Sequence, residues 1–271
     1  MARFKLTIEY AGTRYSGWQI QKNARTVQGE IDRAVRSVTG RKDFELYGSG
    51  RTDAGVHALG QVAHLDVSTS LPPATLRQRL NDDLPADINI LDARIVPHRF
   101  HARHHAVGRA YLYQLATRRT AFAKPYVWWL REPIELARMR DAARAFVGMR
   151  DFKSFAQDDD GDEEGEMAPS TLVLVERLEL VEDGELVLLR IEGSHFLWKM
   201  VRRIVGVLVD VGRGHMTPDA AAGLLASSSG TPARLTAPAS GLFLDRVYYA
   251  GEPRSDEVRP ATPLRASVQS G

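Results

Sequence analysis

The feature that most constrains the fold is the alternation of two periodicities along the chain. Residues 4–10 alternate apolar and polar side chains, which is typical of a strand with one buried face. Residues 27–38 instead carry apolar side chains at helical spacing, and Gly40 follows as a stop signal. Strands interleaved with helices in this way predict an α+β chain built on antiparallel sheet.

The same order of elements recurs in the second half of the chain. The first half continues with strands at 60–67 and 88–96 and a short helix near 76–80. The second half has a strand at 109–116, a helix at 136–148, a hairpin (172–181 and 186–191) around Asp183-Gly184, an apolar helix at 195–211 and a strand at 242–249. We expect two α+β domains, 1–105 and 106–250, and a disordered tail, 251–271, rich in Pro, Ser and charge.

Composition narrows the class of protein. The 271 residues are 44% hydrophobic, which is enough for a sizeable core. No apolar run is long enough to span a membrane, and we expect no signal peptide before the first strand. The chain has no cysteine, which excludes disulfides, thiolate metal sites and thiol catalysis. We expect a cytoplasmic protein.

The charge is unevenly distributed along the chain. Seven acids and no base lie between Asp158 and Glu166; without them, 36 basic residues face 27 acidic ones, a charge of +9. A basic body suits a nucleic-acid partner, because phosphate contacts dominate affinity for such partners. Alternatively, the excess of basic residues reflects a genome bias toward arginine, since the chain has 30 Arg and 6 Lys. We expect the acidic segment to be mobile and to stay clear of bound RNA.

The stretch GSGRTDAGVHALGQVAH, residues 48–64, allows two interpretations. Its glycines permit positive φ angles and close approach by another molecule, so Asp53 beside Arg51 is a candidate reactive carboxylate. Alternatively, Thr52 to Gly55 is an ordinary tight turn in which Asp53 bonds its own backbone. The residue types alone leave both readings open.

Two arginines and a histidine cluster are further candidates. Arg202 and Arg203 fall within the apolar helix, where a guanidinium needs an anionic partner; we expect Arg203 to reach the surface and Arg202 to pair with Asp53. The run from His98 to His105 contains four histidines but no carboxylate framework, so we predict no metal and favour a phosphate-contacting loop. Tyr126, Trp128 and Trp129 are typical either of base stacking or of core packing.

Several segments resemble the tRNA pseudouridine synthase A family. The most specific is GRTDAGVHA, residues 50–58. The others follow in the family's order and span roughly residues 4–249: EYAGT (9–13), GWQ (17–19), TVQGE (26–30), FHAR (100–103), RAYLY (109–113), MVRRIVG (200–206) and APASGL (237–242). The acidic segment departs from the family, in which many members carry a basic Arg-Thr segment there.

The resemblance implies a role for each matching residue. Asp53 would be the nucleophile, Tyr111 would stack on the target uracil, and Arg202 would pair with Asp53. Arg51 would contact RNA or steady the loop, and Leu242 would line the base pocket. We add His57, His101, Arg103 and Arg109 as candidate RNA contacts.

The resemblance also implies a fold and a reaction. Two ferredoxin-like halves would form one large mixed or antiparallel sheet with helices on one face and the active-site cleft between the halves. The implied enzyme is an isomerase that converts uridine to pseudouridine at positions 38–40 of the tRNA anticodon stem-loop, as a homodimer, without a cofactor. Two other classes stay open: a non-catalytic RNA-binding module, which does not need Asp53, and a metal-assisted hydrolase, which needs the histidine run to bind metal.

Overall fold

The computed structural model describes residues 1–156 and 170–264. The acidic segment, 158–166, therefore lies outside the described residues. The chain divides into two compact units: unit 1 comprises Met1–Val107 and Phe243–Arg254, and unit 2 comprises Gly108–Leu242 and Ser255–Gly271. Within the described residues, no helix combines the length and apolarity needed to cross a membrane.

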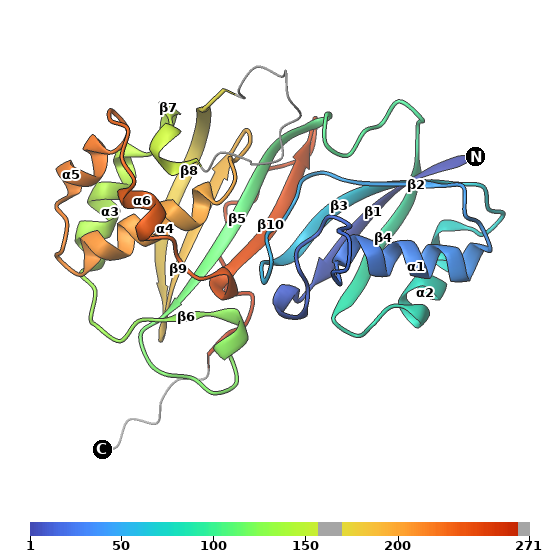
Figure 1. The fold of residues 1–271 in the computed structure, drawn as a ribbon, viewed down its shortest axis with the longest axis horizontal. Coiled ribbons are helices and arrows are strands. Elements are labelled where there is room, and N and C mark those ends of the chain that lie inside the picture. Colours follow the sequence, from blue (N-terminus) through green and yellow to red (C-terminus); the bar gives the residue numbers. More distant parts are fainter. Residues whose placement is uncertain (157–169, 265–271) are drawn as a thin grey trace. The chain divides into compact units, whose positions relative to one another are not determined.

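Unit 1 has the βαββαβ order of a ferredoxin-like fold, with one added strand (Figure 1). Antiparallel pairing joins β4 to β1, β1 to β3 and β3 to β2, while β10 runs parallel beside the first residues of β3. Helix α2 packs on β4 and α1 packs on α2. The elements are β1 (Ala2–Tyr10), α1 (Val27–Thr39), β2 (Glu45–Gly48), β3 (His57–Val67), α2 (Pro73–Asp83), β4 (Ile88–Val96) and β10 (Leu242–Tyr249).

Unit 2 also combines strands with helices, but it has more strands before its long helix than unit 1 has, and the last strand of the chain, β10, belongs to unit 1. The strands of unit 2 follow the order β5-β9-β8-β7 with antiparallel pairing, and β6 lies parallel to β5. Helix α3 packs on β8 and contacts α4 and α5, and Figure 1 shows α3 to α6 gathered together. The elements are β5 (Ala106–Ala116), β6 (Trp128–Trp129), α3 (Leu136–Ala145), β7 (Gly148–Asp151), β8 (Leu172–Asp183), β9 (Leu186–Gly193), α4 (Met200–Gly212), α5 (Pro218–Gly223) and α6 (Thr231–Arg234).

Local chemistry explains where helix α1 begins and ends and where the hairpin of unit 2 turns. The Thr26 hydroxyl accepts from the Gly29 amide and caps α1, which ends where Gly40 takes a left-handed φ of 67°. In the predicted hairpin, Asp183 pairs with Leu186 and Gly184 has a φ of 58°. The α+β class and these elements of the sequence prediction are therefore confirmed.

The start of helix α4 and the position of Arg203 differ from the sequence prediction. The helix begins at Met200 and not near residue 195, because Lys199 has a φ of 59°, a left-handed conformation outside the helix. Arg203 does not reach the surface as expected. It is 6% exposed, and its Nη1 donates to the carbonyl of Ala156.

The C-terminal segment differs from the disordered tail that the sequence predicts. We call residues 255–264 the C-terminal strap, because they are bonded to strands of unit 2 and are not disordered. Arg190 on β9 donates to the Ser255 carbonyl at 2.8 Å. Gln114 on β5 accepts from the Ala261 amide at 2.7 Å and donates to the Thr262 hydroxyl at 3.0 Å. Residues 265–271, the remainder of the predicted tail, lie outside the described residues.

Candidate active site

Asp53 is the first residue of a tight turn. The amide of Val56 donates to the Asp53 carbonyl at 3.1 Å, and Gly55 has a φ of 78°. A positive φ at the third position is the requirement of a type II turn, and glycine adopts it without strain. A tight turn is therefore present, one residue later in the chain than the turn interpretation gives it, and the Asp53 side chain is half-buried.

The loop between Gly12 and Trp18 fixes this turn through backbone hydrogen bonds. The Gly55 amide donates to the Tyr15 carbonyl at 3.3 Å, and the Trp18 amide donates to the Thr52 carbonyl at 3.0 Å. The approach requires glycine, because a Cβ on Gly12 would lie 1.8 Å from the Val56 oxygen. A Cβ on Gly17 would lie 2.6 Å from the Thr52 oxygen. The two glycine motifs therefore fit together through their backbones.

Gln61 fixes the segment before the turn, a role that the sequence analysis missed. It is fully buried on β3; its Oε1 accepts from the Ser49 hydroxyl at 2.7 Å, and its Nε2 donates to the Gly50 carbonyl at 3.1 Å. The available signal was a polar side chain within a largely apolar strand. Such a residue, once buried, must find hydrogen-bond partners.

His57 is buried and makes structural contacts, so it lacks the surface position expected of an RNA contact. It is 1% exposed, and its ring stacks on Phe243 with 4.8 Å between centroids. Its Nδ1 accepts from the Gly12 amide at 3.0 Å, which places the proton of a neutral ring on Nε2. Arg51, in contrast, is exposed.

The segment 98–105 is a firmly held loop with a basic surface. Arg3 donates to the Phe100 carbonyl at 2.7 Å, and Tyr249 donates to the Ala102 carbonyl at 2.7 Å. His101 is half-buried and Arg103 is exposed, as are the neighbouring His98, Arg99, His104 and His105. Among residues 1–156 and 170–264, no group of three or more His, Cys, Asp or Glu side chains is arranged to hold a metal.

Burial keeps two histidines of this region neutral. It lowers the pKa of His64 to about 4, with the charge of nearby Arg3 as the second cause. Burial also lowers the pKa of His101, and the neighbouring His104 contributes. Neutral His64 accepts a hydrogen bond from the Ala102 amide at 3.2 Å, which ties β3 to the loop.

In unit 2, Tyr111 lies half-buried on β5 against a partner that the sequence analysis did not single out. The ring of Phe196 meets it edge to face, with 5.3 Å between centroids and 88° between planes. Arg109, also on β5, donates to the Ser194 carbonyl at 2.9 Å. The segment that precedes α4 thus contacts both predicted residues of β5.

Arg202 and Leu242 flank a second fixed loop of unit 2. The Nε of Arg202 donates to the Ala237 carbonyl at 2.7 Å, and Ala237 donates back to the Arg202 carbonyl at 3.0 Å. Tyr113 donates to the Pro238 carbonyl at 2.7 Å, and Leu242, 5% exposed, follows this loop. Arg202 belongs to unit 2 and Asp53 to unit 1, and their pairing stays a prediction.

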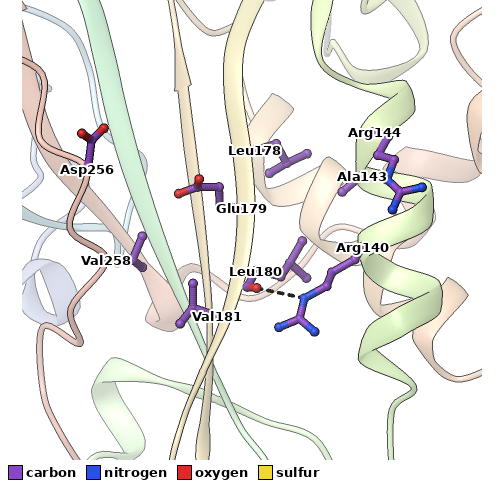
Figure 2. Close-up of a pocket in the computed structure, with 9 residues that line it drawn as sticks. All are labelled: Arg140, Ala143, Arg144, Leu178, Glu179, Leu180, Val181, Asp256 and Val258. Carbon is purple, nitrogen blue, oxygen red and sulfur yellow. Dashed lines mark hydrogen bonds between the residues drawn. The ribbon is translucent and has the colours of Figure 1, made fainter.

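Unit 2 also has an open hollow of about 530 Å³ beside α3 and β8 (Figure 2). Arg140 bounds it and donates to the Leu180 carbonyl at 3.1 Å. The acids that line it, Glu179 and Asp256, both pair with Arg177. None of the residues that line the hollow belongs to the predicted site.

The chain belongs to the tRNA pseudouridine synthase family. The sequence model of that family matches residues 6–105 and 142–250, which include Asp53, Arg202 and Leu242. Arg109 and Tyr111 lie between the matched segments. The family's enzymes are isomerases that convert uridine to pseudouridine in tRNA, and this is the activity of the chain.

Relatives named tRNA pseudouridine synthase A align over most of the chain. One from Syntrophotalea carbinolica is 41% identical over 252 residues, covering 92% of this chain and 97% of that protein. Another from Geotalea uraniireducens is 41% identical over 251 residues, covering 92% and 100%. A third from Maridesulfovibrio salexigens is 39% identical over 254 residues, covering 92% and 91%.

Proposed function

We propose that this chain modifies uridines at positions 38–40 of the tRNA anticodon stem-loop, with Asp53 as the nucleophile. The observation that carries the proposal is the braced turn at Asp53, whose backbone neighbours are fixed by Tyr15 and Trp18. A reacting group held in one place contributes to catalysis by proximity and orientation. The half-buried carboxylate suits attack on a nucleotide that has left its stack.

The reaction would proceed by breaking and remaking a bond to the same base. Asp53 attacks either C1′ of the ribose or C6 of the uracil, and the covalent intermediate divides one difficult step into two. The C1′–N1 bond breaks, the base turns, C1′ bonds to C5, and the bond to Asp53 breaks, which regenerates its carboxylate. The C5 proton is then lost and N1 gains a proton, so substrate and product are isomers. This balance requires neither an oxidant nor a cofactor.

The other predicted residues would bind the substrate. Tyr111, whose ring is oriented by Phe196, would stack on the uracil. Arg202 would keep Asp53 ionised, Leu242 would line the base pocket, and the arginines Arg51, Arg103 and Arg109 would contact phosphates. His101 would contribute from the loop at 98–105, whose backbone is fixed and whose surface is basic.

We infer further that the protein acts in the cytoplasm as a homodimer, with one tRNA reaching both subunits. The family resemblance supports this assembly. Trp128 and Trp129 were also candidates for exposed contact residues. Both are half-buried, however, and the Trp129 ring lies beside Arg119 and Arg131, whose guanidinium carbons are 5.9 Å and 5.6 Å from its centroid.

The test is the Asp53→Asn variant, assayed by tritium release from tRNA labelled with [5-³H]uridine. We expect no release, because an amide cannot form the covalent intermediate, together with retained tRNA affinity from the many phosphate contacts. The matched Asp92→Asn variant, at an exposed position on β4, should keep full turnover. Release by Asp53→Asn protein whose mass confirms the amide would refute the assignment.

The same assay separates the two other classes. A non-catalytic RNA-binding module would bind tRNA and release no tritium even as the unmodified protein. A metal-assisted hydrolase would yield free uracil or cleaved strands, and a chelator would stop it. Release of tritium with intact tRNA and insensitivity to a chelator is the outcome that the proposal requires.

A further inference from the structure

A buried tyrosine that the proposed chemistry does not use lies beside the Asp53 turn. Tyr15 is 4% exposed, and its hydroxyl donates to the carboxylate of Asp87 in the connection between α2 and β4. The Asp87 carbonyl accepts from the Ala11 amide at 2.9 Å. Asp87 therefore binds both the backbone and the side chain of the loop that carries Tyr15.

The backbone of Tyr15 connects this anchor to the turn. Its carbonyl accepts from Gly55 at 3.3 Å, and its amide donates to the Gly12 carbonyl at 3.0 Å. Gly12 itself contacts Val56, the last residue of the turn, so closely that no Cβ fits between them. A displacement of Tyr15 would thus be transmitted to Gly55 and Val56, the last two residues of the segment Asp53–Val56.

The tyrosine ring is also fixed on its face. The guanidinium carbon of Arg25 lies 4.9 Å from the ring centroid, and Arg25 is itself paired with Glu30 at 2.5 Å. Burial and the hydrogen bond to Asp87 raise the pKa of Tyr15, in that order, so the hydroxyl stays a donor at neutral pH. The ring, the hydroxyl and the backbone are therefore all held.

We propose that Tyr15 and Asp87 form a positioning pair that holds the turn carrying Asp53 in its reactive place. The inference rests on the proposed role of Asp53. Neither residue touches the reacting atoms in this scheme; both act through the Gly55 amide and the backbone contacts of Gly12. A small misplacement of a reacting group is costly, about a hundredfold in rate for 1 Å, so the effect should fall on turnover.

The first variant is Tyr15→Phe, which keeps the ring and removes the hydrogen bond to Asp87. We expect kcat for tritium release to fall about tenfold, the equivalent of one hydrogen bond, with the Kd for tRNA unchanged. Exchange of the Gly55 amide, followed by NMR on glycine-labelled protein, should accelerate relative to glycines elsewhere in unit 1. Tyr47→Phe, at an exposed position on β2, is the matched control and should change neither quantity.

Two substitutions at Asp87 test the partner. Asp87→Asn keeps an acceptor oxygen and should retain near-normal kcat and Gly55 exchange. Asp87→Leu removes the acceptor and should reproduce Tyr15→Phe. Normal kcat and normal Gly55 exchange in Tyr15→Phe would overturn the pair. A loss of activity accompanied by a lower Tm and uniformly faster exchange throughout unit 1 would also overturn it, because the role would then be stability alone.

A failure of the positioning pair can be distinguished from a failure of the proposed function. If Asp53→Asn released tritium, Asp53 would not be the nucleophile, whatever the Tyr15 variants do. If Asp53→Asn is inactive and Tyr15→Phe is normal in both measurements, the positioning pair fails while the nucleophile stands. Gly55 exchange does not depend on activity, so it tests the mechanical connection in either case.

Discussion

At the scale of single residues, His64 couples the stability of unit 1 to pH. It lies on β3 with Arg3, His101 and Asp66 around it, and its folded-state pKa is about 4 against an ordinary value of 6.5. Between these values the unfolded chain binds more protons than the folded one. The free energy of unfolding therefore rises with pH through this window, is fully gained above 6.5, and is lost as pH falls toward 4.

We expect the His64→Gln variant to show a shallower rise of Tm between about pH 4 and pH 6.5 than the unmodified protein. Glutamine does not titrate, and its oxygen can still accept from the Ala102 amide. Thermal melts at several pH values provide the measurement, with His98→Gln, at an exposed position, as the control. Equal slopes for His64→Gln and the unmodified protein would contradict the assignment of this pH dependence to His64.

The residues of the turn show what local patterning can predict. Glycine at position 55 is required by a positive φ that the motif itself indicates, so the turn at Asp53 can be predicted from the sequence. The environments of His57 and Gln61 could not be predicted from the sequence, because both depend on residues distant in the chain. His57 accepts from Gly12 and stacks on Phe243, and neither contact leaves a periodic trace in the sequence.

At the scale of elements, the C-terminal strap covers polar groups buried in unit 2. Arg190 and Glu192 form an ion pair of 2.5 Å on β9, each almost fully buried, and the strap accepts one of the hydrogen bonds of Arg190. Gln114, also fully buried, takes two of its partners from the strap. Removing one partner of a buried polar group is costly, about 1–3 kcal/mol for each group left unsatisfied.

Truncation after Arg254 should therefore lower the free energy of unfolding by about 2–4 kcal/mol, even if water replaces some of the lost partners. Denaturant unfolding measures this difference. Truncation after Leu264 keeps the strap and serves as the length control, so that a loss confined to the shorter protein assigns the effect to residues 255–264. Equal stability of the truncated and full-length chains would contradict this role of the strap.

Periodicity predicted the elements better than their ends. Residues 195–199 continue the apolar pattern of α4, yet Lys199 leaves helical geometry and Phe196 packs against Tyr111. A tertiary contact thus overrides a pattern that suits a helix. The strap escaped prediction for a related reason, since its Pro, Ser and charged residues are typical of disorder and its order depends on strand residues far away in the sequence.

At the scale of the whole molecule, assembly is the property to measure. We expect a homodimer, with a mass of about twice 30.1 kDa in light scattering at micromolar concentration. The expectation comes from the family resemblance. Dilution should be examined too, because a dimer that dissociates would show a falling mass. A mass of one chain at every concentration tested would contradict the expectation.

The division into units was only partly predictable. The boundary expected near residue 105 lies close to Val107, because the order of elements restarts there. The sequence could not indicate that residues 243–254 return to unit 1, since the pairing of β10 with β3 joins segments almost two hundred residues apart. Such non-local pairing follows from the three-dimensional fold and not from any window of sequence.

This return has a consequence for how the protein is made. A ribosome releases the chain from its N-terminus, so β3 leaves the ribosome long before the strand that pairs with its first residues, Phe243 with His57 and Leu244 with Ala58. Phe243 also stacks on His57, four residues after Asp53. During synthesis, nearly the whole of unit 2 must be made before β3, the strand that follows the turn at Asp53, acquires this neighbour.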